Sequence, residues 1–389
     1  MIPYGRQSIA QADIDAVVEV LRSDWLTTGP VSEHFEQAFA RECGAREGVA
    51  ANSATSSLHL ACLALGIGPG KRLWTSPNTF VASANCGRYC GAEVDFVDIE
   101  PDTFNMSVDA LSQKLVAAKA TGTLPDVVVP VHFAGQPCDM DRIAELAREY
   151  GFRVIEDAAH AVGARFGEHA TGACEHSDIA VFSFHPVKLI TTGEGGLATT
   201  NDPELAAAMR SFRSHGITRE PSRMSAAPDG DWYYEQVELG FNYRMTDIAA
   251  ALGLSQLDAL AGFIERREQL VARYDERLED LAVIRPVVRS GRRSAWHLYV
   301  VQVDAERGAP PRRAVFEAMR KGGIGVNVHY IPVHTQPYYR ALGFEPGDFP
   351  VAEAYYDRAI SLPLYPDLSE SDQDRVVDTL RAATRVVTR

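Results

Sequence analysis

Lys188 lies between a strongly apolar run and a glycine-rich one. The segment SFHPVKLITTGEGG, residues 183–196, places this lysine after an expected strand and before three glycines. A lysine held against the end of a buried strand loses hydration, which lowers its pKa and suits it to Schiff-base chemistry. Most lysines instead extend their ammonium groups into water. Lys188 by itself therefore leaves both interpretations open.

Asp157 supplies a second reactive group at the end of the apolar run RVIED, residues 153–157. A carboxylate at a neighbouring strand end can pair with the pyridine nitrogen of pyridoxal phosphate and keep it protonated. Taken alone, the same aspartate is equally well explained as a helix cap after a strand. The combination with Lys188 favours a pyridoxal-phosphate site, because accident seldom places both groups in this order.

A third feature is the segment NSATSS, residues 52–57, after an expected strand at 48–51. Small hydroxyl residues at a helix N-terminus stand beside free backbone N–H groups, which favour a phosphate. Such caps are common, so this segment alone is weak evidence. Together with Lys188 and Asp157 it completes the groups that a phosphorylated aldehyde cofactor would need.

The elements that must position these groups alternate between short apolar runs and helical patterns from about residue 47 to 200. This alternation predicts an α/β fold with a mainly parallel sheet covered by helices, whose ligands collect at the carboxyl ends of the strands. A helix is expected at 11–24, before this region. The expected strands include 94–99, 126–133, 153–157 and 178–184.

The pattern changes after residue 246 to a long helical stretch followed by apolar runs at 296–303 and 323–331. We therefore expect a large cofactor-binding domain at 1–250, including the N-terminal helix. A smaller C-terminal α+β domain is expected at 251–389.

The composition of the 389 residues narrows the class of protein. A formal charge of −14 argues against nucleic acid or an anionic membrane as a partner. No N-terminal signal pattern and no sufficiently long apolar stretch is evident, so a cytoplasmic protein without a membrane span is expected. The six cysteines lack zinc-type pairing, so reduced thiols and no metal site are expected.

Several segments in the same order resemble the DegT/DnrJ/EryC1/StrS family of sugar aminotransferases, a branch of the fold-type I pyridoxal-phosphate enzymes. The resemblance runs from about residue 4 to the C-terminus. The segments that carry it are WLTTGP at 25–30, EDAAHAVGA at 156–164, SFHPVK followed by TTGEGG, and GFNYRMTDIAAALGLSQL at 240–257.

The resemblance implies roles for individual residues. Lys188 matches the lysine that anchors the cofactor, Asp157 its pyridinium partner and Phe80 the ring that stacks on it. Asn242 matches a residue contributed by the neighbouring subunit, which implies a homodimer with shared active sites. The phosphate-binding positions match Thr55, Ser56 and Ser183, and two further positions near the cofactor match His160 and His185.

A lysine at position 188 favours amino transfer over the dehydration that a relative with histidine there performs. Residues 231–247 and 323–340 are most similar to the branch that aminates C4 of a UDP-linked 2-acetamido-2,6-dideoxy-4-keto hexose on the way to pseudaminic acid. Glutamate is the implied amino donor. The substrate-binding candidates are Trp25, Thr27, Lys188, His329, Tyr330 and Tyr338, and the remaining histidines His59, His132, His176 and His215 are expected to be structural.

Of three alternative functions, the sequence leaves one open and argues against the other two. A dTDP-linked sugar or amination at C3 is not distinguished by these residues. A nicotinamide dehydrogenase would need a strand-linked G-x-G-x-x-G motif, which is missing. A non-catalytic member of the fold is disfavoured by the presence of Lys188 and Asp157.

Overall fold

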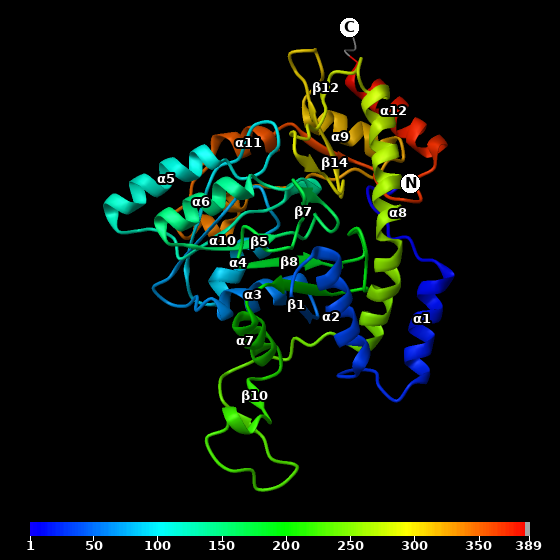
Figure 1. The fold of residues 1–389 in the computed structure, drawn as a ribbon. Helices are drawn as coiled ribbons and strands as arrows, with labels where there is room; N and C mark the ends of the chain where they lie inside the picture. The colour runs from blue at the N-terminus through cyan, green and yellow to red at the C-terminus, as the bar shows by residue number, and fades with distance from the viewer. Residues whose placement is uncertain (386–389) are drawn as a thin grey trace.

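A seven-stranded sheet forms the centre of the computed structural model, which describes residues 1–385 (Figure 1). Its strands are β1 (Glu47–Ala51), β2 (Arg72–Thr75), β3 (Glu93–Phe96), β4 (Val127–Val129), β5 (Arg153–Asp157), β8 (Ile179–Ser183) and β9 (Gly196–Thr200). Their order is β1-β9-β8-β5-β4-β2-β3. Only β9 runs antiparallel to its neighbours, so the sheet is mainly parallel, as the sequence predicts.

Helices cover both faces of this sheet, which explains why its strands are apolar throughout. In β4, Val127 and Val129 pack into one core cluster while Val128 packs into another. The first face is covered by α3 (Ala54–Ala64), α4 (Ala82–Tyr89) and α7 (Pro203–Arg213). The other face is covered by α2 (Pro30–Cys43), α5 (Val108–Thr121), α6 (Met140–Tyr150) and part of α8 (Asp247–Arg277).

The observed strands agree with the expected ones in place and differ in length. β5 occupies residues 153–157 as expected, whereas β4 ends at Val129 rather than at residue 133. Pro130 follows directly, and proline lacks the N–H that a central strand must donate. The antiparallel β9 lies in the glycine-rich segment after Lys188, where the sequence gives no alternating pattern.

The C-terminal part contains a smaller antiparallel sheet of β12 (Val283–Ile284), β14 (Tyr299–Val303) and β15 (Ala359–Leu362). Residues 323–331 do not form a strand of this sheet. They make isolated bridges instead, from Ile324 to Ile2 and from Asn327 to Ser361. The helices after α8 are α9 (Arg312–Lys321), α10 (Pro337–Arg340), α11 (Pro350–Tyr356) and α12 (Glu370–Thr384). Near the N-terminus, α1 (Gln11–Arg22) packs against α8.

The helix α8 connects the two sheets over 31 residues (Figure 1). Its Ile264 packs beside the large sheet, and its Tyr274 packs in the C-terminal core. The domain boundary expected between residues 250 and 251 falls inside this helix and stays a prediction. Contrary to expectation, α8 is long and apolar enough by composition to cross a membrane. It packs against α1 and α2, which is the setting of a core helix in a folded protein.

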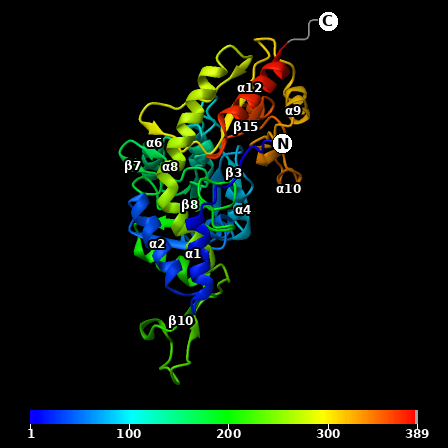
Figure 2. The same cartoon turned by 90° about the vertical axis from the view of Figure 1, so that its right-hand side faces the viewer.

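A lobe formed by residues 214–242 projects from the body of the molecule (Figures 1 and 2). It contains the short antiparallel pair β10 (Ile217–Thr218) and β11 (Glu235–Gln236). Several large apolar side chains on it are exposed: Ile217, Trp232, Tyr234, Val237 and Leu239.

Candidate active site

A cavity of about 520 Å³ lies where β5 and β8 end and α3 begins. This is the carboxyl edge of the parallel strands, where open α/β sheets bind ligands. One wall comes from the large sheet and its helices, and another comes from residues 297 and 327–330 of the C-terminal part. The predicted site residues that line it are Thr55, Phe80, Asp157, His160, Ser183, His185, Lys188, His329 and Tyr330.

Lys188 follows β8 and faces this cavity. Its backbone N–H donates to the carbonyl of His185 at 2.8 Å, which closes a turn after the strand. Loss of hydration lowers the pKa of Lys188 to about 8, and the nearby charge of Asp157 partly opposes this shift. The residue is half-buried at the cavity wall. A substantial fraction of neutral amine exists near pH 8, which a nucleophilic lysine requires.

Asp157 at the end of β5 is buried and held by two donors. The hydroxyl of Ser83 on α4 donates to its Oδ2 at 2.5 Å, and the backbone N–H of Ala159 donates to Oδ1 at 3.1 Å. Both bonds fix the direction of the carboxylate. Sequence reasoning missed Ser83, because a serine inside a helical pattern gives no sign of a distant aspartate.

The N-terminus of α3 forms another part of the wall. Ser53 caps the helix, since its Oγ accepts the N–H of Ser56 at 3.1 Å. The first-turn residues Ala54 and Thr55 line the cavity together with Ser183 of β8. A side chain at Gly196 would place its Cβ 2.4 Å from the Ala54 nitrogen, so only glycine lets β9 approach this closely.

Ser56 does not line the cavity, although it lies in the same turn. Its hydroxyl donates to Asn52 Oδ1 at 2.6 Å and contacts Ser53 Oγ at 3.0 Å. Within one chain its role is therefore to hold the cap. A direct contact with phosphate stays a prediction.

His160 and Tyr330 bond to each other across the cavity wall. Nδ1 of His160 accepts the backbone N–H of Ala134 at 3.3 Å, so its proton must reside on Nε2, which lies 3.0 Å from the Tyr330 hydroxyl. Burial and the charge of Lys188 lower the pKa of His160, which keeps the ring neutral. Burial likewise lowers the pKa of His329 to about 3, and this ring bonds Ser361 Oγ at 2.7 Å.

The remaining predicted site residues lie away from this cavity within a single chain. Trp25 is 55% exposed, and Thr27 forms an isolated bridge to Thr246. Asn242 forms an isolated bridge to Ser214 at the base of the projecting lobe. The hydroxyl of Tyr338 accepts from Arg88 Nε at 3.3 Å. A role from a neighbouring subunit, as expected for Asn242, is compatible with these positions and stays a prediction.

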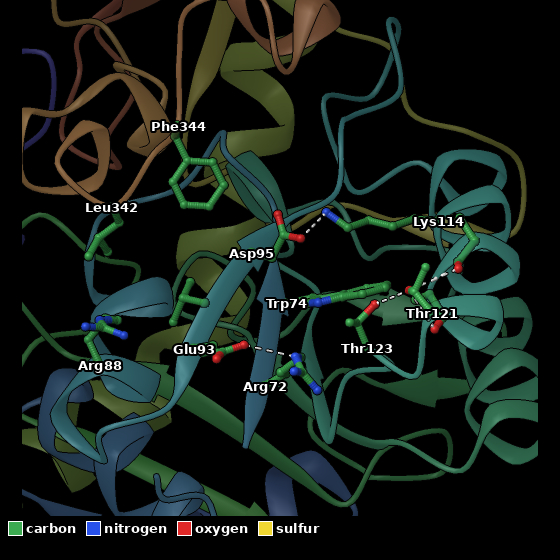
Figure 3. Close-up of a pocket in the computed structure, with 13 residues that line it drawn as sticks. Arg72, Trp74, Arg88, Glu93, Asp95, Lys114, Thr121, Thr123, Leu342 and Phe344 are labelled. Atoms are coloured by element: carbon green, nitrogen blue, oxygen red, sulfur yellow. Dashed lines mark hydrogen bonds and ion pairs between the residues drawn. The ribbon is translucent and has the colours of Figure 1, made fainter. Parts of the chain in front are cut away.

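A second cavity of about 710 Å³ lies at the other end of the sheet, beside β2 and β3 (Figure 3). Two acid–base pairs line it, Arg72 with Glu93 at 3.0 Å and Lys114 with Asp95 at 2.7 Å. Arg88 also lines it and donates from Nη1 to the carbonyl of Ala92 at 2.6 Å. Lys114 also lies 4.9 Å from the centre of the Trp74 ring. Each acid of this cavity is paired with a base, so the cavity lacks the combination of a desolvated amine and an unpaired carboxylate that the first one has.

The residues of the first cavity fit pyridoxal phosphate by the chemistry of their donors. Lys188 provides an amine of lowered pKa, and Asp157 provides an oriented carboxylate for a pyridinium nitrogen. The first turn of α3, with the hydroxyls of Thr55 and Ser183, provides donors for a phosphate. Phe80 provides an exposed aromatic face at the same cavity.

The sequence similarity to known proteins extends over nearly the whole chain. The spore coat polysaccharide biosynthesis protein SpsC of Bacillus subtilis is 42% identical over 384 residues, which are 98% of this chain and 96% of SpsC. The protein MJ1066 of Methanocaldococcus jannaschii is 38% identical over 99% of this chain and 97% of its own length.

Solved structures share the fold over the same extent. Spr1654 of Streptococcus pneumoniae, assigned as a sugar aminotransferase and solved in its PMP form, matches with a TM-score of 0.90 and 32% identity, over 98% of this chain and 99% of its own. The aminotransferase PseC of Helicobacter pylori, which takes part in the biosynthesis of pseudaminic acid, matches with a TM-score of 0.88 and 28% identity, over 98% of this chain and 99% of its own.

A sequence model of the DegT/DnrJ/EryC1/StrS aminotransferase family matches residues 7–381. Spr1654 has also been solved in a PLP form, at 32% identity and a TM-score of 0.88. The family expected from the sequence is thereby confirmed, as are the α/β fold and the cofactor. The chain belongs to the DegT/DnrJ/EryC1/StrS aminotransferase family and is a pyridoxal-phosphate-dependent sugar aminotransferase.

Proposed function

We propose that this aminotransferase takes an amino group from L-glutamate and transfers it to C4 of a UDP-linked 2-acetamido-2,6-dideoxy-4-keto hexose. The observation that carries amino transfer is that Lys188 and Asp157 face one cavity. The likeness to PseC over nearly the full chain supports a sugar nucleotide on the way to pseudaminic acid or a related amino sugar. His329 and Tyr330 line the same cavity and are the proposed sugar contacts.

Pyridoxal phosphate, when bound, supplies a ring that withdraws electrons from the carbon bearing the transferred nitrogen. Asp157 would hold the proton on the pyridine nitrogen, and Ser83 keeps that carboxylate in place. With the cofactor bound, the Nζ of Lys188 would move a proton from the α-carbon of glutamate to the cofactor, and in the second half-reaction would move a proton from the cofactor to C4 of the sugar. The lowered pKa of Lys188, about 8, allows its amine to accept and release that proton near neutral pH.

We further propose a homodimer in which each subunit completes the other's site. Among the residues that line the described cavity, Lys188 is the one lysine or arginine. Glutamate has two carboxylates and a sugar nucleotide has a diphosphate, so further cations or donors must come from outside this wall. The projecting lobe 214–242 carries exposed Trp232 and Leu239, which suit burial against a second copy. Asn242 lies at its base, and Trp25, Thr27 and Tyr338 are proposed to contact substrate in that assembly.

We place the protein in the cytoplasm. All six cysteines are free in the structure, and five of them are buried. Reduced thiols of this kind are typical of a reducing compartment. Fractionation of cells that express the tagged chain would check this placement.

The substrate is tested by supplying purified protein, pyridoxal phosphate and L-glutamate with a panel of UDP- and dTDP-linked 4-keto-6-deoxy sugars. We expect an aminated product from the UDP-linked 2-acetamido sugar, identified by mass, with the new amine located at C4 by NMR. Product from dTDP-linked sugars alone would contradict the proposed nucleotide. Amine at C3 would contradict the proposed carbon, and 2-oxoglutarate formation would report separately on glutamate as the donor.

A further inference from the structure

His297 lines the cavity and has no partner for either ring nitrogen among residues 1–385. The side chain is only 4% exposed, and its Nδ1 is enclosed without a hydrogen bond. Nε2 likewise forms no hydrogen bond with the described residues, but it is not enclosed, so it is the ring nitrogen that a molecule in the cavity can reach. A neutral imidazole has one donor and one acceptor, and buried groups of this kind are normally paired.

The backbone around His297 is fixed, so the ring cannot easily turn to find a protein partner. The N–H of Ala295 donates to Gly135 at 3.0 Å, and the N–H of Leu298 donates to Ala134 at 3.3 Å. On the other side, Arg267 of α8 is fully buried. Its Nη1 donates to the carbonyls of Trp296 at 3.1 Å, His297 at 3.3 Å and Leu364 at 2.9 Å.

The surroundings also keep the ring neutral. Burial lowers the pKa of His297 well below its usual value, and the neighbouring His160, Lys188, Arg267 and His329 add to this effect. The centre of its ring lies 4.4 Å from that of His160, which is itself bonded to Tyr330. His297 therefore offers a neutral hydrogen-bonding group beside the residues that face the cofactor and the proposed sugar.

We propose that His297 is a further binding residue of this site, whose Nε2 forms a hydrogen bond with a hydroxyl or phenolic oxygen of the bound molecule. This oxygen belongs either to the cofactor or to the amino-accepting sugar, and the second case rests on the proposed function. In both cases an oxygen of the ligand supplies the hydrogen-bond partner that the described residues do not provide for Nε2. Nothing in the sequence separates His297 from the apolar run WHLYVVQV, so its role emerges only from the fold.

The test compares His297→Phe, which keeps a ring without nitrogen, with His297→Gln, which keeps a polar group near the position of Nε2. His169→Phe, a change at an exposed histidine, is the matched control. One arm titrates pyridoxal phosphate into cofactor-free protein and follows its absorbance. A second arm measures the binding of UDP-linked sugars to the holoenzyme by calorimetry, and a third follows 2-oxoglutarate released from L-glutamate.

We expect His297→Phe to weaken binding of the cofactor or of the sugar about 3- to 10-fold, with His297→Gln restoring most of it. A change confined to the first arm assigns the cofactor oxygen, and one confined to the second assigns the sugar. Unchanged binding in both arms would overturn the proposal. The proposal would also be overturned if His297→Phe and His297→Gln lost binding affinity equally and both unfolded at a lower temperature than wild type. That result would indicate that His297 has a packing role. If no UDP-linked sugar binds wild-type protein, the proposed substrate fails while the cofactor arm still decides on His297.

Discussion

Lys188 owes its proposed chemistry to the place of its amine rather than to its residue type. The chain has five lysines, and this one follows β8 into a cavity whose walls remove part of its hydration. Lys114 lies in the other cavity and is paired with Asp95 at 2.7 Å. At the scale of single residues, burial without an ion pair separates a reactive amine from a structural one.

Replacement of Lys188 by alanine or arginine should reduce turnover by at least about 10²- to 10⁴-fold, because no other lysine or arginine in the described wall can carry the proton. Steady-state assays with L-glutamate, together with the visible absorbance of the bound cofactor, measure this effect. Lys114→Ala is the control and should retain activity. A Lys188→Ala protein that kept multiple turnovers and the wild-type absorbance band would refute the assignment.

The lowered pKa of Lys188 should also make the unfolding free energy of the cofactor-free protein depend on pH. The folded-state pKa, about 8, is below the usual 10.5, so the unfolded chain binds more protons between these values. Stability from this group is present above about pH 10.5 and is lost as pH falls through 8. The unfolding free energy of Lys188→Met at pH 7 should therefore be larger than that of wild type by roughly 1–3 kcal/mol. The difference is about 1 kcal/mol where water in the cavity hydrates the amine.

Urea denaturation of both cofactor-free proteins at pH 7 and pH 10.5 checks this prediction. We expect the difference between them to narrow at the higher pH. A constant difference across this range would mean that the amine is fully hydrated in the folded state.

At the scale of elements, the site depends on how closely β9 approaches the start of α3. Gly196 begins β9 directly against Ser53 and Ala54, and the antiparallel pairing of β9 with β8 and β1 fixes this distance. The helix N-terminus is thereby placed beside Ser183 at the end of β8. Glycine at this position is needed for close packing rather than for an unusual backbone angle.

Gly196→Ala should displace the first turn of α3 and weaken the binding of pyridoxal phosphate, because its Cβ would meet the Ala54 nitrogen at 2.4 Å. Overpacking of this kind costs about 1–3 kcal/mol. Cofactor titration and thermal unfolding measure the two effects. Gly68→Ala, where a Cβ meets nothing within 4 Å, is the control. Wild-type cofactor affinity in Gly196→Ala would show that the α3 turn does not bind the phosphate.

At the scale of the whole molecule, the cavity is closed by parts of the chain that lie far apart in sequence. Tyr330 donates its backbone N–H to Asn78 Oδ1 at 3.1 Å, which joins the C-terminal wall to the large sheet's side of the cavity. The N-terminal Ile2 packs in the C-terminal core. Within residues 1–385, the lobe 214–242 exposes large apolar side chains, and it is the surface that we propose to pack against a second copy.

The shared site can be tested by mixing two inactive variants, Lys188→Ala and Asn242→Ala. If Asn242 acts across the interface, each mixed dimer contains one complete site, so refolding equal amounts together should restore about a quarter of wild-type activity. Activity of the mixture, with each variant refolded alone as control, measures this. If the mixture recovered no activity although light scattering showed dimers, Asn242 would act in the site of its own subunit or in neither site.

Sequence alone was sufficient where a pattern is local or a motif is shared. The apolar runs predict β5 and β8 because strands buried on both faces must be apolar, and the family motifs identify the cofactor enzyme. Sequence patterns did not predict three features: the antiparallel β9, the short β4 and the irregular segment 323–331. Strand direction and pairing depend on neighbours that lie far away in the chain.

The same division holds for the site. Lys188 and Asp157 could be found from their places after apolar runs, whereas Ser83 and His297 could not, because each acts through a contact between distant segments. Residue type and order determined which chemistry the chain can perform. Only the tertiary structure decided which groups lose their hydration and which meet across the cavity, because burial and distance are properties of the folded chain.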